Sequence, residues 1–364
     1  MRLPKPNNII TEKYVVGMSV FKNRLAKIKL SANESALGPS PKAKKEYIKV
    51  SKSFARYPDT NGTFLRETLS KKFKLDKNRI VLGSGSDQIF ELICKAYLKK
   101  GDEVIVPKYS FIIYRIYSKM NGAKVIYSNE NNFTVSVKDI LKKVTTKTKV
   151  VFLANPNNPT GTYVSQDEVE TFLSDLPDHV ITVLDEAYFE YVRPFGVTDY
   201  PDGVALLARF PNLIVTRTFS KAYGLAALRV GYAIATPEIT EILNRVRPPF
   251  NVNSMGLAAA EAALSDSDFI SQCVTENADQ LVQLNHAFVD LDLTTIPSVA
   301  NFICVQVGSN ASKIYELMLA QGVIVRPIGN YGLPEHLRIT VGLPSENQKV
   351  IATLRKIISD LAGA

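Results

Sequence analysis

The chain has 364 residues, of which 46% are hydrophobic and 22% charged, and its formal net charge at pH 7 is +9. This length accommodates about two domains, whose core needs neither disulfides nor a structural metal to stay folded. The three cysteines form no CxxC pair, which argues against a disulfide framework and against a cysteine zinc site.

The N-terminus and the charge pattern point to neither a membrane nor a nucleic acid. The first 17 residues contain basic side chains but not the apolar stretch of a secretory signal, and no apolar run approaches the roughly 18 residues of a membrane span. The lysines are dispersed, without the aromatic-basic pattern of nucleic-acid binding. We therefore expect a cytoplasmic protein with a lysine-rich solvated surface, whose positive field favours anionic ligands.

From residue 79 to about residue 235, short apolar segments alternate with amphipathic ones. We predict strands at 79–83, 103–107, 123–127, 149–154, 180–184, 212–217 and 230–235, with helices between them, such as 86–98 and 165–174. Several of the strands are continuous apolar runs, which are typical of strands buried on both faces of a parallel sheet. The sequence thus predicts an α/β fold with a mostly parallel seven-stranded sheet between helices.

After about residue 255 the pattern changes. We predict helices at 257–264, 268–290 and 311–320, strands at 300–307, 323–327 and 337–341, and a final helix from 345. This order is typical of a smaller α+β domain. The N-terminal segment is too short to fold alone, so the predicted division is a large domain, 45–255, and a small domain made of 1–44 and 256–364.

Polar motifs follow several of the predicted strands, at the edge where open α/β sheets bind ligands. The first is Gly83–Asp87, whose glycines let the backbone approach a phosphate and whose helix start offers free N–H groups. An ordinary capped turn would explain this motif equally well. Tyr109 follows the next strand and can stack on a flat ring, although packing is the commoner role of a lone tyrosine.

Two further motifs follow the central strands. Asn155–Gly161 contains two prolines that fix the backbone, so Asn158 can be held against a ligand; a simple tight turn is the alternative. Asp185 directly follows the strand 180–184 and can hold a proton on a ring nitrogen, with Tyr188 donating to a ring oxygen. A helix N-cap is the alternative role of this aspartate.

The last motif is Thr218-Phe219-Ser220-Lys221, with Arg229 eight residues further on. Two hydroxyls and an arginine form a phosphate-binding set, and a deprotonated lysine amine condenses with an aldehyde. Taken alone, Ser-Lys after a strand is more often a surface loop. Together the five motifs specify one ligand, a flat ring with a protonated nitrogen, a phenolic oxygen, an aldehyde and a phosphate.

On these motifs the sequence resembles the fold-type I aminotransferases that use pyridoxal 5′-phosphate, and among them the histidinol-phosphate aminotransferases. The resemblance extends from the region of Tyr14 to the final helix, and Arg56-Tyr57-Pro58-Asp59 and Leu337–Gly342 narrow it toward this subfamily. It implies that Lys221 forms the Schiff base and shuttles the proton. It also implies that Asp185 pairs with the pyridine nitrogen, and makes Lys221, Asp185 and Tyr188 the expected catalytic residues.

The resemblance implies roles for the other motif residues as well. Asn158 and Tyr188 would bind the 3′ oxygen, and Tyr109 would stack on the ring. The phosphate would be held by Gly85, Ser86, Asp87, Thr218, Ser220 and Arg229. Tyr57 would reach the cofactor phosphate of a neighbouring subunit, which implies a homodimer. The expected substrate-binding residues are Tyr14, Asn33, Arg326 and Arg338, although a surface salt bridge explains Arg326 equally well.

Two segments near the expected substrate entrance depart from the family pattern. The usual Asn-Glu-Asn-Pro is Asn33-Glu34-Ser35-Ala36 here, and the usual Tyr-x-Pro-Gly is Tyr14-Val15-Val16-Gly17. The implied reaction is ping-pong transamination from glutamate to imidazole-acetol phosphate, which gives 2-oxoglutarate and L-histidinol phosphate, in histidine biosynthesis. An aromatic amino acid aminotransferase and a threonine-phosphate decarboxylase-like lyase stay open. A cofactor-binding regulator would need an N-terminal helix-turn-helix domain, for which the chain before Leu30 is short.

Overall fold

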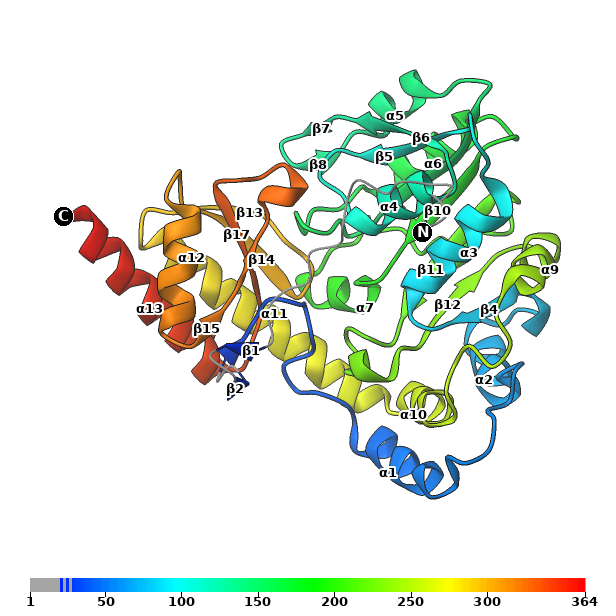
Figure 1. Cartoon of the computed structure of the whole chain (residues 1–364), viewed down its shortest axis with the longest axis horizontal. Coiled ribbons are helices and arrows are strands. Elements are labelled where there is room, and N and C mark those ends of the chain that lie inside the picture. Colours follow the sequence, from blue (N-terminus) through cyan, green and yellow to red (C-terminus); the bar gives the residue numbers. More distant parts are fainter. Residues whose placement is uncertain (1–19, 22–23, 26–27, 364) are drawn as a thin grey trace, which may run out of the picture.

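A seven-stranded sheet forms the larger part of the molecule in the computed structural model, which describes residues 20–21, 24–25 and 28–363 (Figure 1). The strands lie in the order β4-β12-β11-β10-β9-β5-β6. Only β12 runs antiparallel to its neighbours, so the predicted mostly parallel sheet is confirmed. The strands are β4 (Ile80–Gly83), β5 (Glu103–Pro107), β6 (Lys124–Ser128), β9 (Thr148–Ala154), β10 (Ile181–Asp185), β11 (Leu213–Thr218) and β12 (Gly231–Ile234).

The sheet is buried on both faces, as its apolar strands predict. Successive residues of β9 illustrate this: Phe152 packs into the core on one face and Leu153 into the core on the other. One face is covered by α3 (Ser86–Tyr97), α4 (Ile112–Met120) and α9 (Pro237–Val246). Side chains on the other face come from α2 (Thr63–Phe73), α5 (Val137–Lys143), α6 (Gln166–Asp175), α8 (Gly203–Leu206) and α10 (Ser254–Leu264).

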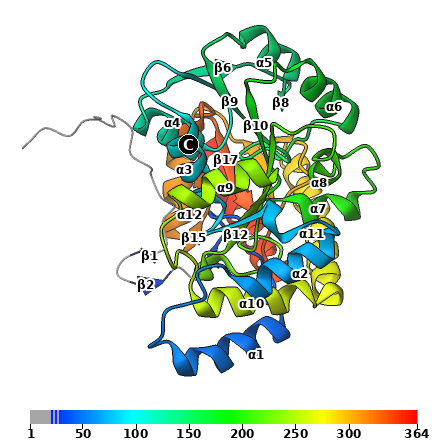
Figure 2. The ribbon, with the colours of Figure 1, turned by 90° about the vertical axis from the view of Figure 1, so that its right-hand side faces the viewer.

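A second, antiparallel sheet has the order β13-β14-β17-β16. Its strands are β13 (Thr294–Ile296), β14 (Phe302–Gln306), β16 (Arg326–Pro327) and β17 (His336–Thr340). The helices that pack with it are α11 (Ser267–Val289), α12 (Ala311–Ala320) and α13 (Pro344–Ala362). Figure 1 shows this layer beside the large sheet, with α11 extending from one toward the other; Figure 2 shows the same arrangement from the side.

The N-terminal segment joins both parts. The strand β3 (Ile28–Lys29) pairs in parallel with β15 (Val323–Ile324), whereas α1 (Pro41–Val50) packs against α10. Short hairpins are formed by β1 (Val20–Phe21) with β2 (Arg24–Leu25) and by β7 (Glu130–Asn131) with β8 (Thr134–Val135). The remaining elements are α7 (Phe189–Val192) and the 3-10 turns Ser51–Ser53, Lys77–Arg79, Arg193–Phe195, Ala226–Leu228 and Gly329–Tyr331.

Most predicted elements occur within a few residues of their expected positions, but the prediction of one strand at 323–327 is wrong. The chain changes partner at Val325: β15 pairs with β3, and β16 pairs with β17 in the antiparallel sheet.

The predicted domain division stays a prediction. Its boundaries cut two continuous helices, since 44/45 falls inside α1 and 255/256 inside α10. Among the described residues, no helix has the length and apolar composition needed to cross a membrane.

Candidate active site

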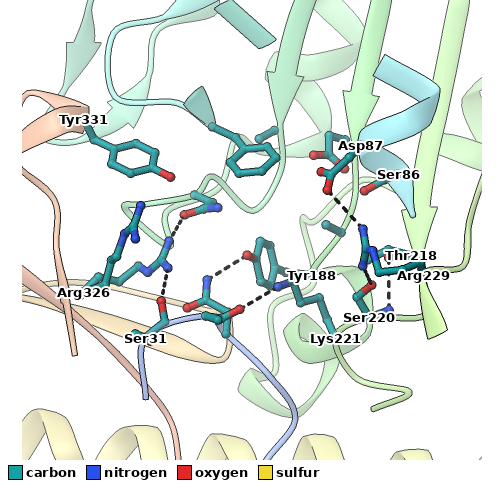
Figure 3. A pocket seen from close by; sticks show the side chains of 18 residues that line it. Ser31, Ser86, Asp87, Tyr188, Thr218, Ser220, Lys221, Arg229, Arg326 and Tyr331 are labelled. Carbon is teal, nitrogen blue, oxygen red and sulfur yellow. Dashed lines mark hydrogen bonds and ion pairs between the residues drawn. The ribbon is translucent and has the colours of Figure 1, made fainter. Parts of the chain in front are cut away.

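A cavity of about 180 Å³ lies beyond the carboxyl ends of β9, β10 and β11, between the large sheet and the antiparallel one (Figure 3). Its lining comes from segments far apart in the sequence, because both sheets and the N-terminal segment contribute to it. Twelve of the sixteen predicted site residues line it: Asn33, Ser86, Asp87, Asn158, Asp185, Tyr188, Thr218, Ser220, Lys221, Arg229, Arg326 and Arg338.

One end of the cavity is built to bind an anion. Arg229 donates to Ser220 Oγ at 3.1 Å and forms an ion pair with Asp87 at 3.2 Å, at the start of α3. Gly85 precedes that helix, and a β-carbon there would lie 2.2 Å from Arg229 Nη2. Glycine therefore allows the arginine to lie against the loop, beside the unpaired N–H groups of the helix terminus. Hydroxyls, an arginine and a helix N-terminus are the donors that a phosphate prefers.

Lys221 lies in the middle of the cavity wall, and its amine donates to Ala32 O at 3.0 Å. Burial and, to a smaller extent, the nearby Arg338 lower the pKa of this amine to about 8. A substantial fraction of the amine is therefore neutral near pH 8, and a neutral amine is a nucleophile and a base.

Asp185 ends β10 and is buried at the bottom of the cavity. Its Oδ1 accepts a hydrogen bond from Thr216 Oγ1 at 3.0 Å, and its Oδ2 accepts one from Tyr114 Oη at 2.5 Å. Burial raises the pKa of Asp185 to about 6, while the two hydroxyl donors lower it. At neutral pH the group is mainly a carboxylate, which can hold a proton on a ring nitrogen.

Asn158 and Tyr188 are fixed by partners on the opposite wall. Arg338 Nη1 donates to Asn158 Oδ1, which is the acceptor of this side chain. The Asn158 amide nitrogen, Nδ2, has no hydrogen-bond partner among the described residues. Asn33 Nδ2 donates to Tyr188 Oη at 2.9 Å. Asn33 adopts a left-handed backbone conformation (φ 55°) and is held by Thr340. Both groups keep a donor for a phenolic oxygen in the cavity.

Two arginines form the substrate-facing wall. Arg326 and Arg338 are directly opposed in the antiparallel pair β16/β17, which places their side chains on the same face of the sheet. They are 6% and 5% exposed and both line the cavity. In the part of the chain that the structure describes, no carboxylate lies within ion-pair distance of Arg338, whose Nε also lacks a partner. A buried charge without a counter-ion is costly, so the Arg338 guanidinium is suited to an anionic ligand.

The structure differs from the sequence prediction at Tyr109. Its ring lies outside the cavity lining, near Phe133 and Gly332, and its backbone amide donates to Glu130. Phe111, two residues later, lines the cavity instead. Phe111 is the N-cap residue of α4, and it lines the cavity together with Ala154 at the end of β9.

Two other predicted residues, Gly85 and Tyr57, are not among those that line the cavity. A β-carbon at Gly85 would meet Arg229, as described above. Tyr57 is 82% exposed and stacks on Phe250 with ring centroids 4.6 Å apart, away from the cavity of its own chain. Tyr14 lies outside the described residues.

The sequence analysis did not single out Tyr331 or Tyr114. Tyr331 lies in the turn after β16, and Figure 3 shows its hydroxyl directed into the cavity beside Arg326. It stands next to a glycine between the two predicted strands, which is a weak signal for a binding loop. Tyr114 touches Asp185 from 71 positions away in the sequence, and no local pattern indicates such a contact.

These groups fit one kind of ligand. The phosphate-binding end, the lysine amine, the buried carboxylate and the two donors for a phenolic oxygen match the phosphate, aldehyde, ring nitrogen and hydroxyl of pyridoxal phosphate. The buried Asp185, whose carboxylate faces a cavity, is the observation that makes the fit specific. No cluster of three His, Cys, Asp or Glu side chains suited to a metal ion occurs in the described residues.

Comparisons with known proteins agree with this geometry. Residues 26–354 match the family "Aminotransferase class I and II". The chain is 45% identical over 332 residues to histidinol-phosphate aminotransferase 2 of Pseudomonas fluorescens, covering 91% of this chain and 89% of that protein. It is 43% identical over 363 residues to histidinol-phosphate aminotransferase of Pelagibacter ubique, covering 99% of this chain and 100% of that protein. The crystal structure of histidinol-phosphate aminotransferase from Sinorhizobium meliloti, in complex with pyridoxal-5′-phosphate, superposes on this chain with a TM-score of 0.88 at 28% identity. The superposition covers 93% of this chain and 92% of that chain.

Proposed function

The chain belongs to the class I and II aminotransferase family, and we propose that it transfers an amino group between L-histidinol phosphate and 2-oxoglutarate. The chain is an enzyme, an aminotransferase of histidine biosynthesis, and its cofactor is pyridoxal 5′-phosphate. In the biosynthetic direction, glutamate gives up its amino group in the first half-reaction and leaves as 2-oxoglutarate. In the second, imidazole-acetol phosphate takes the amino group and leaves as L-histidinol phosphate.

The paired arginines Arg326 and Arg338 carry this proposal for the substrate. Two buried guanidinium groups on one wall provide more donors than a single carboxylate needs, whereas a phosphate dianion can use both. The same wall accepts the carboxylates of glutamate in the other half-reaction. The enzyme thus binds two differently shaped anionic substrates with one set of cations.

The chain's own residues would hold four parts of the cofactor: its phosphate, its ring nitrogen, its 3′ oxygen and the face of its ring. Arg229, Ser220 and the amides at the start of α3 would bind its phosphate, and Thr218 would support Ser220 through the hydrogen bond from the Ser220 amide to Thr218 Oγ1. Asp185 would pair with the ring nitrogen, and Asn158 and Tyr188 with the 3′ oxygen. We propose Phe111, instead of Tyr109, as the residue that packs on the ring. When bound, the cofactor supplies an electron sink for the negative charge that develops at the substrate α-carbon.

Lys221 is the proposed covalent attachment point and proton carrier. Its neutral amine would hold the cofactor covalently through the aldehyde carbon and, once displaced by the substrate amine, would act as the base that takes and returns the proton of the substrate α-carbon. Ala32 O, which accepts from the amine at 3.0 Å, keeps the side chain inside the cavity while it is not bonded. Arg338 orients the substrate and also lowers the pKa of the amine.

The pH dependence of cofactor capture follows from the lowered pKa of Lys221. Only the neutral amine reacts, so the capture rate rises with pH and levels off above the pKa of about 8. Between pH 7 and pH 9 we expect an increase of about tenfold, measured by stopped-flow absorbance after mixing cofactor-free protein with pyridoxal phosphate. Arg338→Gln removes the second cause of the lowered pKa of Lys221. In this variant the midpoint of the curve of capture rate against pH should therefore lie at higher pH. A rate still rising at pH 10, as for an ordinary lysine, would contradict the assignment.

Arg326 tests the choice of substrate. Arg326→Gln removes one cation from the substrate-facing wall, and we expect kcat/KM for L-histidinol phosphate to fall about 10- to 100-fold, mainly through KM. The kcat/KM for phenylalanine, which has no phosphate, should change little. Arg245→Gln, in an exposed helical ion pair with Glu241, serves as the control and should leave both values unchanged. Equal losses for the two substrates would favour the aromatic amino acid aminotransferase.

We also propose a homodimer to which Tyr57 is contributed across the interface. Several large apolar side chains are exposed on α1, on the segment between α1 and α2, on α2 and in the loop after α9: Tyr47, Ile48, Phe54, Tyr57, Phe64 and Phe250. Of these, Tyr57 and Phe250 stack on each other, and exposed apolar side chains that gather on a folded protein are typical of interfaces. The cytoplasmic location stays a prediction.

Mixing two defective variants tests the contribution of Tyr57. In a hybrid of Lys221→Ala and Tyr57→Ala subunits, one of the two sites has both native residues if Tyr57 acts across the interface. Refolding the variants together should therefore restore part of the activity that either variant lacks, measured as transamination per dimer. A hybrid no more active than the Tyr57→Ala dimer would place Tyr57 in its own subunit's site. Tyr127→Ala, at an exposed tyrosine of the large sheet, should not impair activity.

A further inference from the structure

Asp185 is held by two hydroxyl groups from different elements. Thr216 Oγ1 on β11 donates to Oδ1 at 3.0 Å, and Tyr114 Oη on α4 donates to Oδ2 at 2.5 Å. A hydroxyl that donates to a carboxylate stabilises its charged form and fixes its orientation. The two contacts therefore leave the Asp185 carboxylate ionised and aligned with the cavity.

The Tyr114 hydroxyl cannot leave this position easily, because three aromatic rings fix the tyrosine. Its ring stacks on Phe152 with centroids 4.6 Å apart, and it meets the edges of Phe90 and Phe111 at 5.0 and 5.7 Å. Tyr114 has no exposed surface, and Asp185 Oδ2 is the one side-chain acceptor that it contacts among the described residues. Phe111 lines the cavity, so the same cluster supports the cavity wall.

The charges around Asp185 explain why these hydroxyls are needed. Burial raises the pKa of Asp185, and Asp87 at the start of α3 raises it further. The other titratable groups that face Asp185 are Tyr188 from the loop after β10 and Lys221 across the cavity. Burial, and then Asp185 itself, raise the pKa of Tyr114 well above its ordinary value. Tyr114 thus keeps its proton and remains a donor at every pH at which the enzyme works.

We propose that Tyr114 is a positioning residue which, together with Thr216, keeps Asp185 a carboxylate that points at the ring nitrogen of the cofactor. Tyr114 itself touches neither substrate nor cofactor. The inference rests on the proposed role of Asp185. Beyond that role, we infer that the Tyr114 hydroxyl sets the strength of the contact between Asp185 and the ring nitrogen of the cofactor. This hydroxyl lies behind the aspartate, on the face of the sheet covered by α3, α4 and α9.

The test uses pyridoxamine 5′-phosphate, which binds without a bond to Lys221. Its affinity for cofactor-free protein is measured by fluorescence between about pH 5 and pH 8.5, for the natural protein, Tyr114→Phe and Thr216→Val. In the natural protein the affinity should fall as the pH drops through about 6, because Asp185 becomes protonated. In Tyr114→Phe one donor to the carboxylate is lost. This fall at low pH, the acid limb of the profile, should therefore move by about one unit to higher pH, so the affinity should be lower by about tenfold near pH 5 and by about twofold at pH 7.

Two variants complete the design. Tyr97→Phe removes another buried hydroxyl, one that has no partner among the described residues, and should leave the pH profile unchanged. Thr216→Val removes the second donor with little change of shape and should shift the acid limb in the same direction, which keeps the proposal testable if Tyr114→Phe does not fold.

The possible outcomes are distinct. An unshifted acid limb in a folded Tyr114→Phe protein, or in Thr216→Val, would overturn the inference while leaving the proposed function intact. Weaker binding with an unshifted limb would indicate a merely structural role and would also overturn it. Failure of the natural protein to bind pyridoxamine phosphate would contradict the proposed function itself.

Discussion

Replacement of Lys221 by alanine is expected to abolish transamination, with a loss of at least about 10⁴-fold in kcat. The residue supplies both the covalent attachment and the base that moves the α-proton, and general base catalysis alone contributes about 10²–10⁴-fold. Its position supports both roles, because its amine lies in the cavity with a pKa lowered to about 8 by burial. The measurement is steady-state turnover, together with borohydride reduction and peptide mass spectrometry to locate the attached cofactor.

Lys72→Ala provides the matched control for this variant. Lys72 is also partly buried, with a pKa lowered by burial, but it donates to Tyr223 and lies outside the cavity lining. The Lys72→Ala variant should keep its transamination activity, and borohydride reduction should still find the cofactor attached to Lys221. Attachment of the cofactor to another lysine in the natural protein, or turnover by Lys221→Ala close to the natural rate, would refute the assignment.

Replacement of Asp185 by asparagine is expected to have the second largest effect. The amide has nearly the same shape, but its single oxygen can accept from only one of the two hydroxyls of Tyr114 and Thr216, and it carries no charge to hold a proton on the ring nitrogen. Removing one preorganised electrostatic group from an active site typically lowers kcat by about 10²–10³-fold. We expect a loss of that size, with weaker cofactor binding, measured by turnover and by equilibrium titration with pyridoxal phosphate.

The folded state itself should tolerate this change. Burial raises the pKa of Asp185 in the cofactor-free protein, so a neutral side chain at this position does not weaken the core. The thermal unfolding midpoint of cofactor-free Asp185→Asn should thus match or exceed that of the natural protein. Asp199→Asn, at an exposed aspartate, is the control for turnover. Unchanged kcat in Asp185→Asn would contradict the role of the ring-nitrogen contact.

The sequence predicts the large sheet well because its signals are local. Each strand is marked by an apolar run, such as Val150–Ala154, and its carboxyl end is marked by the turn residues that follow. The site lies at the edge of the sheet where these carboxyl ends meet. The order of the strands and the antiparallel direction of β12 are not local properties. The change of partner at Val325 likewise depends on β3, almost 300 positions earlier in the chain.

The site shows the same limit. Residues next to strand ends, such as Lys221 and Asp185, were predicted correctly to lie in one cavity. Tyr109 is not among the residues that line this cavity, whereas Phe111, at the start of α4, is, and the sequence offers either aromatic side chain. The contact of Tyr114 with Asp185 depends on how α4 packs on the sheet. Such contacts arise from tertiary packing, and no spacing rule along the chain predicts them.

The most direct test of the proposed function identifies the products of the complete reaction. Purified protein loaded with pyridoxal phosphate is incubated with L-histidinol phosphate and 2-oxoglutarate, and the products are followed by mass spectrometry and NMR. We expect glutamate and imidazole-acetol phosphate in equal amounts, and a much higher kcat/KM for L-histidinol phosphate than for phenylalanine. Equal or faster transfer from phenylalanine would make the chain an aromatic amino acid aminotransferase. Release of carbon dioxide from threonine phosphate, without formation of glutamate from any amino donor, would contradict the account and indicate a decarboxylase.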